Sequence, residues 1–378
     1  MTDIHAQTKA TILREISAVT NRFDAGQHGT RFEDLGVDSF DLVTIRCTLE
    51  QKLGRAIPDH AWLGFRDVDD IVRFYVADSP SSNEPAADRQ ADTTRRFKLN
   101  MPQMAIGGLS ESWMFRELGD VHWQGICHGL RTESHSIADD AGNRLYATFV
   151  RFRWEGSDHL KSFQENEPVR IENRLARYGK GMFFSDATIE GREKSIRASL
   201  MSAFTSRQGD NKSLLKGEPV VPEDCPIAVL ESLPPFSEEY RQMRKRLLQG
   251  VELGGEQLLY SSGVLDEVEY ALNPYQDFNG VNLLYFAAYP AISDICERQF
   301  AHRDSERIGL KSDWACQTST VARDIFYFGN CEISETLVFR VHSFRAHPGG
   351  NACIAGSLSR KSDGQLLCNI FTVKKWHG

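Results

Sequence analysis

Apolar residues recur at helical spacing in the first 77 residues of the chain. A helix is predicted over residues 8–20, because its apolar residues fall on one face: Ile12, Leu13, Ile16 and Val19. A second helix follows Ser39 and mixes charged residues with the apolar residues Leu42, Val43, Ile45, Leu49 and Leu53. A short helix from Val68 to Tyr75 closes the segment. The pattern therefore predicts a small helical domain over residues 1–77.

The composition changes after this domain. Residues 78–94 contain no large apolar residue and are rich in Ser, Pro, Ala and Asp, which is typical of a flexible linker. We place this linker at residues 78–95. From residue 96 onward, alternating apolar and polar residues predict long antiparallel strands that are joined by polar turns.

The strand-rich part contains an internal repeat. Leu99-Asn100-Met101-Pro102-Gln103 recurs as Leu272-Asn273-Pro274-Tyr275-Gln276, and each run precedes a turn with glycine and a mostly apolar helix. The first helix is predicted over Leu109 to Leu118 with Gly119 as a left-handed cap, and the second over Val281 to Tyr289, ended by Pro290. Three strands follow each helix: residues 169–175, 182–189 and 196–204 after the first, and residues 337–344, 352–358 and 366–373 after the second.

One buried helix wrapped by an antiparallel sheet is the hot-dog arrangement. The repeat therefore predicts an α+β chain in which the helical domain is followed by a double hot-dog domain. The first hot dog is placed at residues 96–210, a crossing segment at 211–262 and the second hot dog at 263–378. The alternative is two unrelated α+β units whose short sequence similarity arose by chance.

Charge and composition narrow the classes of function. The 378 residues carry a formal net charge of −8, which argues against a nucleic-acid or anionic-membrane partner. No apolar run reaches the length of a membrane span, and the first residues lack the apolar core of a signal peptide. The eight cysteines form no Cys-x-x-Cys pair, and the histidines lack metal-ligand spacing. We therefore expect reduced thiols, no metal and a cytoplasmic location.

The run Gly36-Val37-Asp38-Ser39, which turns into the second helix, is the strongest candidate for chemistry. Asp38 or Ser39 can cap this helix, and the helix start favours a phosphodiester on the Ser39 hydroxyl. With the surrounding helices, the run resembles acyl carrier proteins over residues 4–77. The resemblance implies a four-helix carrier domain with 4'-phosphopantetheine attached covalently to Ser39 by a phosphopantetheinyl transferase. Phe40 departs from the leucine that usually follows the serine.

Two further stretches are candidates for thioester chemistry. Gly107 and Gly108 lack side chains, so their backbone amides, with those of Leu109 and Ser110 at the predicted helix start, are candidates for an oxyanion hole. Close packing of the helix against its sheet explains the same glycines at least as well. Tyr146 begins an aromatic strand, and the alternation alone indicates a half-buried sheet residue.

The segment from Asn100 to Glu111, with Leu118-Gly119-Asp120 and His122-Trp123 after it, resembles the bifunctional acyltransferase/decarboxylase of leinamycin-type polyketide biosynthesis. This resemblance covers residues 96–378. It implies a double hot-dog enzyme that decarboxylates methylmalonyl-CoA, or a similar acyl-CoA, and loads the propionyl group on the phosphopantetheine of a carrier protein. It also implies a catalytic tyrosine that holds the acyl group as an ester. Tyr146 is the best match and Tyr178 the alternative, and polyketide synthase components are the expected partners.

Two other functions stay open. A hot-dog dehydratase or thioesterase that acts on carrier-bound chains usually needs a His–Asp pair or a carboxylate at the helix, and Glu111 is the carboxylate available there. A non-catalytic hot-dog module that docks a carrier is the third interpretation. Paired hot dogs often associate further, so a homo-oligomer is also considered.

Overall fold

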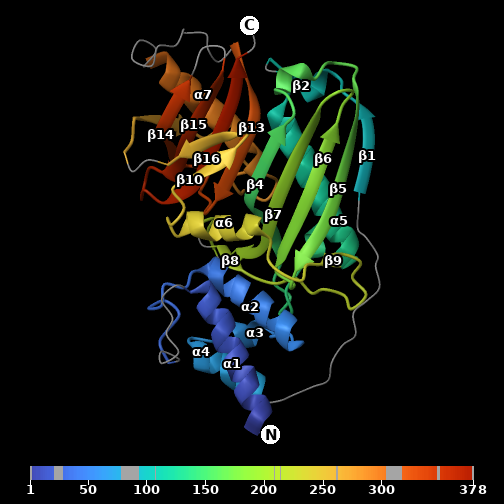
Figure 1. Cartoon of the computed structure of the whole chain (residues 1–378), viewed down its shortest axis with the longest axis vertical. Helices are drawn as coiled ribbons and strands as arrows, with labels where there is room; N and C mark the ends of the chain where they lie inside the picture. Colours follow the sequence, from blue (N-terminus) through green and yellow to red (C-terminus); the bar gives the residue numbers. More distant parts are fainter. Residues whose placement is uncertain are drawn as a thin grey trace.

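The computed structural model describes residues 2–20, 29–77, 93–106, 108–207, 209–212, 214–260, 263–303, 317–346 and 350–376. These residues form an N-terminal helical domain and a much larger sheet domain (Figure 1). No helix in these ranges is both long enough and apolar enough to cross a membrane. Most of the predicted linker lies outside the described residues, but its last residues, from Thr93 to Arg95, belong to the first strand.

The helical domain contains α1 (Thr2–Val19), α2 (Ser39–Leu53), α3 (Asp59–Trp62) and α4 (Val68–Ala77). Its core unites the predicted apolar faces, with Ile12, Ile16, Ile45, Leu49 and Ile71 fully buried. The Asp38 carboxylate caps α2 by accepting hydrogen bonds from the amides of Phe40 at 2.8 Å and Asp41 at 2.9 Å. Ser39 is therefore the first residue of α2, and Asp38 rather than Ser39 provides the cap.

A twelve-stranded sheet forms the frame of the second domain, and its main path runs β1-β5-β6-β7-β4-β13-β16-β15-β14-β12. The first half contains β1 (Thr93–Lys98), β4 (Tyr146–Gly156), β5 (Pro168–Tyr178), β6 (Met182–Glu190) and β7 (Ser195–Arg207). The second half contains β12 (Asp266–Ala271), β13 (Thr318–Tyr327), β14 (Thr336–Ala346), β15 (Asn351–Arg360) and β16 (Leu366–Trp376). Outward from the central pair β4–β13, the two halves follow equivalent orders: β7, β6, β5, β1 and β16, β15, β14, β12.

One long helix belongs to each half, α5 (Glu111–Leu130) before β4 and α7 (Tyr289–Arg303) before β13. Both helices contribute to the same apolar core as the strands, with Met114 and Phe115 from α5 and Ile292 and Phe300 from α7. Phe115 stacks on Phe152 of β4 with ring centroids 3.9 Å apart. The two helices therefore share one interior with both halves of the sheet.

The predicted bounds of both helices are wrong. The second helix, predicted over Val281 to Tyr289, instead begins at Tyr289. The residues before it form a turn, in which the Asn279 side chain accepts from the amides of Val281 and Leu283, and then a 3-10 turn. α5 continues through Gly119 to Leu130 and ends at Arg131, which adopts the left-handed conformation. Gly119 instead lets the Phe286 ring approach the helix, because a Cβ atom at this position would lie 2.3 Å from its Cζ. Pro290 does not end the second helix but lies in the first turn of α7, where a missing amide costs no hydrogen bond.

The segment between the halves holds β8 (Leu214–Lys216), β9 (Ala228–Val229), α6 (Pro235–Arg244), β10 (Gly250–Leu253) and β11 (Glu256–Leu259). β8 pairs with β7, and β9 pairs with β5. α6 and β8 lie at the end of the sheet domain that faces the helical domain (Figure 1). The hairpin of β2 (Met104–Ala105) and β3 (Gly108–Leu109) lies at the opposite end. Short 3-10 turns complete the domain: η1 (Met101–Gln103), η2 (Ser134–Ser136), η3 (Leu160–Ser162) and η4 (Phe286–Ala288).

A buried ion pair joins α5 to the centre of the sheet. Arg323 on β13 donates to both carboxylate oxygens of Glu111, at 2.7 and 3.0 Å. The Trp154 indole also donates to Glu111, at 2.8 Å, and Arg323 donates to Asp294 of α7 at 2.8 Å. Both charges are withdrawn from water and depend on these partners. Glu111 therefore holds α5 to the sheet, and Arg323 links both helices to β13.

The substitution Glu111→Gln keeps the side-chain size and removes the charge opposite Arg323. Loss of one partner from a buried ion pair typically costs about 3–5 kcal/mol. We expect the free energy of unfolding to fall by about 3 kcal/mol, the lower end of this range, because Asp294 still pairs with Arg323. Urea denaturation followed by circular dichroism measures this change.

Glu117→Gln is the matched control, because Glu117 lies on the same helix and pairs with Arg95 at a partly exposed site. Its effect should stay below about 1 kcal/mol. Equal losses for the two variants would contradict the structural role of Glu111.

Candidate functional site

One face of α2 is buried inside the helical domain, and the opposite face is buried against the sheet domain. Phe40 meets Tyr240 of α6 edge to face, with ring centroids 4.7 Å apart. Val43 and Cys47 belong to the same apolar cluster as Tyr240. Gly179 allows this close approach, because a Cβ atom there would lie 2.6 Å from the Cβ of Cys47. The helical domain is therefore docked on the sheet domain through an apolar contact.

Opposite charges hold the start of α2 to the end of α6. The Arg244 Nε atom donates to the Asp38 carboxylate at 2.7 Å, and the Lys245 ammonium pairs with Asp41 at 2.7 Å. An Nη atom of Arg244 also lies 3.4 Å from the hydroxyl oxygen of Ser39. These contacts set the position of Ser39 relative to the sheet domain.

Further along α2, Arg46 is surrounded by three carboxyl groups. It pairs with Glu50 and Asp59 of its own domain and with Glu218 of the sheet domain, the last at 3.0 Å. Burial, with repulsion from Glu50, raises the pKa of Glu218 to about 8, although Arg46 opposes this shift. Burial also raises the pKa values of Glu50 and Asp59. Lys180 opposes the shifts of Glu218 and Glu50 as well. The two cations do not offset the burial of three carboxyl groups, so the docked state favours a bound proton.

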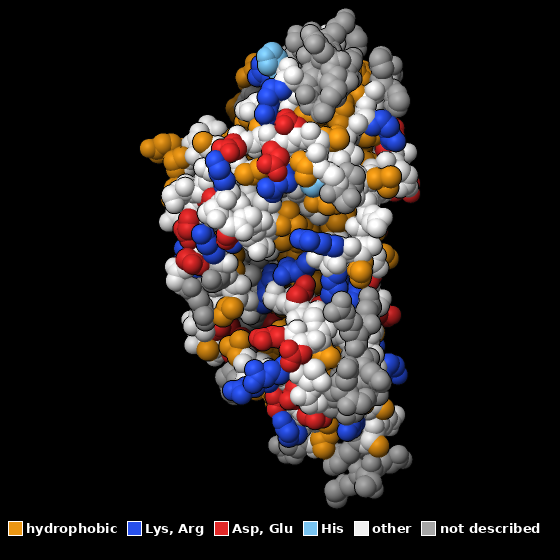
Figure 2. Space-filling view, turned by 90° about the vertical axis from the view of Figure 1, so that its left-hand side faces the viewer, with side chains coloured by type: hydrophobic (Ala, Val, Ile, Leu, Met, Phe, Trp, Pro, Cys, Tyr) orange, Lys and Arg blue, Asp and Glu red, His pale blue; other side chains and the backbone are white. Residues whose placement is uncertain are grey.

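Ser39, which is exposed, opens on a cavity of about 220 Å³ at the junction of the domains. Aromatic and aliphatic side chains from both halves of the sheet domain line it, among them Phe149, Val150, Leu283, Tyr285, Phe286, Tyr289 and Tyr327. Lys216 and Arg244 lie in the same wall as Ser39. Figure 2 shows basic side chains close together at mid-height of the molecule, where the two domains meet. The Ser39 hydroxyl thus stands beside cations at a chamber that has both polar and apolar walls.

The charged groups of this cavity are basic. The described residues in its walls include Lys212, Lys216 and Arg244, but no Asp, Glu or His. Burial and the nearby Arg244 charge lower the pKa of Lys216 to about 7. The Tyr240 hydroxyl donates to the backbone oxygen of Tyr327 at 2.8 Å. These walls can therefore stabilise an oxyanion, but they contain no carboxylate or imidazole base.

Tyr146, the predicted catalytic residue, lies next to this cavity rather than in it. It is the first residue of β4 and lines a second cavity of about 230 Å³. The Arg144 guanidinium lies 4.9 Å from the Tyr146 ring centroid, and that of Arg207 lies 5.8 Å from it. Lys216 lines both cavities. The structure therefore brings Ser39 and Tyr146 to the same end of the sheet domain, on the two sides of Lys216.

Tyr178, the alternative catalytic residue, takes part in docking. Its hydroxyl donates to the Thr48 hydroxyl of α2 at 3.0 Å, and its ring belongs to the buried cluster with Phe40 and Val43. Burial raises the pKa of the Tyr178 hydroxyl. Tyr178 is not among the described residues that line either cavity.

The predicted oxyanion residues lie elsewhere. Gly107 is outside the described residues, and Gly108 and Leu109 form β3 at the end of the sheet domain away from α2 (Figure 1). Gly108 has a φ of 100°, and a Cβ atom there would lie 2.2 Å from the Leu160 backbone oxygen. Ser110 caps α5 by accepting from the Trp113 amide at 3.3 Å. The structure does not bring this stretch together with Ser39 or Tyr146, and its role as an oxyanion hole stays a prediction.

Sequence analysis missed Lys216 and Arg244. Both fell in the predicted crossing segment, and no local motif distinguished them from solvated basic residues. Only the docking of α2 on β8 and α6 gives these two cations a shared position beside Ser39.

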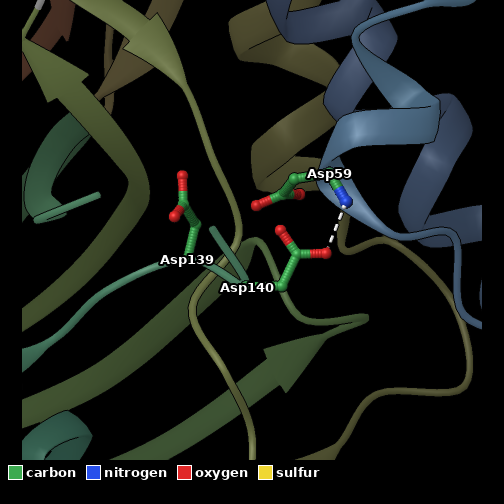
Figure 3. Close-up of side chains that lie close together, drawn as sticks. All are labelled: Asp59, Asp139 and Asp140. Carbon is green, nitrogen blue, oxygen red and sulfur yellow. Dashed lines mark hydrogen bonds between the residues drawn. The ribbon is translucent and has the colours of Figure 1, made fainter. Parts of the chain in front are cut away.

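Three carboxylates from the two domains also meet at the junction. Asp59 at the start of α3 faces the loop that carries Asp139 and Asp140, and one oxygen of each side chain lies within 4.8 Å of the others (Figure 3). The Asp59 amide donates to Asp140 at 2.8 Å, and Asp139 accepts from the amides of its own turn. The sequence did not predict this cluster, and these contacts give it a role in docking.

Comparisons with known proteins support the prediction that the helical domain is a carrier domain. Residues 10–75 match the family described as phosphopantetheine attachment site. Over 65 residues the chain is 37% identical to the acyl carrier protein of Clostridium perfringens (strain SM101 / Type A), an alignment that covers 16% of this chain and 86% of that protein. Through its N-terminal domain, the chain belongs to the acyl carrier protein family. The predicted covalent 4'-phosphopantetheine is thereby confirmed as the cofactor of this carrier domain.

The sheet domain is similar in fold to hot-dog thioesterases. A protein described as an oleoyl thioesterase from Lactobacillus plantarum aligns with a TM-score of 0.51 and 10% identity over 76% of this chain and 97% of that chain. A 12:0-ACP thioesterase from Umbellularia californica aligns with a TM-score of 0.49 and 11% identity over 76% of this chain and 95% of that chain, below the level at which we infer a shared fold. At these identities the similarity shows the fold alone. The carrier domain is therefore followed by a domain of hot-dog thioesterase-like fold.

The Glu218 site makes docking of the carrier domain depend on pH. A glutamate pKa is ordinarily near 4.5, and docking raises that of Glu218 to about 8. Docking therefore retains a proton, so it should be strongest at low pH, weaken as pH rises through this interval and level off above about pH 8. Hydrogen exchange of the α2 amides in the full chain, corrected for intrinsic rates, measures this dependence.

Glu218→Gln should flatten the profile, because the amide cannot ionise. Glu223→Gln, at an exposed position of the same segment, should leave it unchanged. A profile that rises with pH in the parent chain, or that persists in Glu218→Gln, would show that another group controls docking.

Proposed function

We propose that the carrier domain holds its cofactor at Ser39 and presents it, within the same chain, to a thioester-processing site in the adjoining cavity. The observation that carries this proposal is that Ser39 lines a cavity whose other walls belong to the sheet domain. The residues fit the cofactor, because the Ser39 side chain is exposed and Asp38, not Ser39, caps α2. Arg244 also lies within reach of a group on the Ser39 oxygen.

The sheet domain is proposed to be a double hot dog. Equivalent strand orders in the two halves, each with one long helix before its central strand, support this interpretation. The cavity beside Ser39 draws residues from both halves, such as Phe149 of β4 and Tyr327 of β13. Two fused units would therefore provide one site at their junction.

The proposed reaction is decarboxylation of a methylmalonyl-type CoA thioester and transfer of the acyl group to the carrier. Loss of carbon dioxide needs a site that strips water from the carboxylate and donors for the enolate oxygen. Aromatic walls such as Phe149 and Phe286 meet the first need, and the Lys216 ammonium meets the second. Hydrolysis or dehydration requires a general base, and the described walls of the Ser39 cavity supply neither a carboxylate nor an imidazole. The Tyr146 cavity contains Asp59 and Asp139, but Asp59 pairs with Arg46 and Asp139 accepts from the amides of its own turn.

Tyr146 is the proposed acyl-holding residue. Its hydroxyl oxygen would bond to the thioester carbonyl carbon as the C–S bond of CoA breaks, and the phenolic proton would leave on the CoA sulfur. Carbon dioxide loss from the malonyl-type ester leaves an enolate, which takes a proton from solvent. The cofactor on Ser39 would supply the accepting thiol. As the acyl group leaves, the bond between the Tyr146 oxygen and the acyl carbon breaks, and the Tyr146 oxygen regains the proton from that thiol. Lys216 borders both the Tyr146 and the Ser39 cavities, which supports passage between them.

Thioester hydrolysis is the second candidate, favoured by the fold similarity to a protein described as an oleoyl thioesterase. It requires a carboxylate near the substrate. Glu111 is engaged by Arg323 and is not among the described residues of either cavity. The carboxylates that do line the Tyr146 cavity, Asp59 and Asp139, are engaged by Arg46 and by backbone amides. The decarboxylation proposal therefore takes precedence.

Ser39→Ala should abolish modification of the chain. Incubation with a phosphopantetheinyl transferase and coenzyme A, followed by peptide mapping, should place the adduct on Ser39 in the parent chain and nowhere in the variant. Ser17→Ala, an exposed serine on α1 of the same domain, should be modified as the parent is. An adduct that maps to another residue would overturn the assignment.

Tyr146→Phe keeps the ring and removes only the hydroxyl, so stability should change by about 1 kcal/mol or less. Carrier loading from methylmalonyl-CoA should fall by at least about 100-fold, the usual loss when a group that acts in the transition state is removed. Carbon dioxide release and intact-protein mass, measured side by side, report the two steps. Tyr275→Phe is the matched control, because its side chain is 94% exposed.

Parent rates of both steps in Tyr146→Phe would make Tyr146 structural and direct attention to Tyr178. Hydrolysis of an acyl group from the carrier, without carbon dioxide release, would favour the second candidate.

A further inference from the structure

Two cations beside Ser39 have positions that their contacts within the protein do not explain fully. Arg244 donates to Asp38 at 2.7 Å and also reaches the Ser39 oxygen at 3.4 Å. Lys216 lines the same cavity wall from β8. Two like charges therefore face one short stretch of the carrier domain, at the atom that accepts the cofactor.

Lys216 is the less satisfied of the two. No hydrogen bond or ion pair joins its ammonium to another described residue. Thr205, its partner across the β7–β8 ladder, also lines the cavity and is 2% exposed, and its hydroxyl has no hydrogen-bond partner among the described residues. A buried hydroxyl and a half-buried cation without partners on neighbouring strands are the groups that an anion would satisfy.

We infer that Lys216 and Arg244 form the seat for the phosphodiester at the base of the arm on Ser39, so that modification of the carrier tightens its docking on its own sheet domain. This inference rests on the assignment of Ser39 in the proposed function. Without a phosphate, Arg244 and burial disfavour the charged form of Lys216 and lower its pKa to about 7. A negative charge between the two cations would remove that repulsion and replace it with charge-assisted hydrogen bonds.

The arrangement also bears on the acyl acceptor. A carrier that is held more firmly once modified keeps its arm at the cavity of the same chain. Carriers of other chains would have to displace it from a contact that includes Phe40 and Cys47. The seat therefore favours the fused carrier as the acceptor over a separate one.

Cys47 provides a readout of docking that needs no substrate. Its side chain is fully buried at the junction, against Gly179, so a thiol reagent reaches it only after the domains separate. The full chain is compared before and after modification with acetyl-CoA and a phosphopantetheinyl transferase, which leaves the arm without a free thiol. Iodoacetamide labelling of Cys47, followed by peptide mapping, should slow by about tenfold on modification, which corresponds to about 1.4 kcal/mol.

Lys216→Met should abolish this difference between the modified and unmodified chain, whereas Lys216→Arg should preserve it. Lys361→Met, which removes an exposed lysine that pairs with Glu269 and does not line the Ser39 cavity, should also preserve it. Phosphorus NMR of the modified chains is the second measurement, and the phosphodiester resonance should shift in Lys216→Met but not in Lys361→Met.

Equal labelling of both forms of the parent chain, with the arm mapped to Ser39, overturns this inference and leaves the proposed function intact. An undiminished difference and an unshifted resonance in Lys216→Met overturn it as well. If the arm maps to another residue, the Ser39 assignment fails first and this inference fails with it.

Discussion

The second apolar face of α2 is the feature on which the arrangement of the molecule depends. Phe40, Val43 and Cys47 lie opposite the residues that α2 gives to the core of its own domain. Exposure of such a face costs roughly 25 cal/mol for each Å² of apolar surface. Contact with Tyr240 removes that surface from water, and Ser39, the residue before Phe40, has its position set by the same contact.

The charged part of the junction acts in the opposite direction. Docking withdraws Arg46 and three carboxyl groups from water, and a single guanidinium cannot neutralise all of them. The apolar contact therefore supplies the attraction, while the charge cluster makes the docked state sensitive to protons. On the other side of α2, Arg244 and Lys216 concentrate positive charge near Ser39, which is the sign that a phosphate attracts.

The same geometry separates the candidate residues by role. Ser39 and Tyr146 lie at one end of the sheet domain, in cavities that share Lys216. Gly108 and Ser110 lie at the other end, where a close backbone contact with Leu160 and the cap of α5 account for their identities. Glu111 follows directly and is engaged by Arg323. The carboxylate that an alternative dehydratase or thioesterase would use is therefore held in the core.

Local sequence patterns determined the helical domain, its helix that starts at Ser39 and the pairs of strands in the sheet, because apolar periodicity and turn residues act over a few neighbouring positions. They wrongly predicted helix ends at Gly119 and Pro290, because glycine and proline are common at helix ends. In the structure, Gly119 makes room for the Phe286 ring, and Pro290 lies in the first turn of α7. They also showed that Phe40 stands where carrier proteins usually have a leucine, without explaining it. In the structure the Phe40 ring packs edge to face against Tyr240, which explains the aromatic residue. The positions of Lys216, Arg244 and Glu218 were decided only by the tertiary structure. Glu218 and Arg244 contact residues of α2 that lie 171 and 205 positions away in the sequence. No local pattern records a contact that forms between surfaces so far apart along the chain.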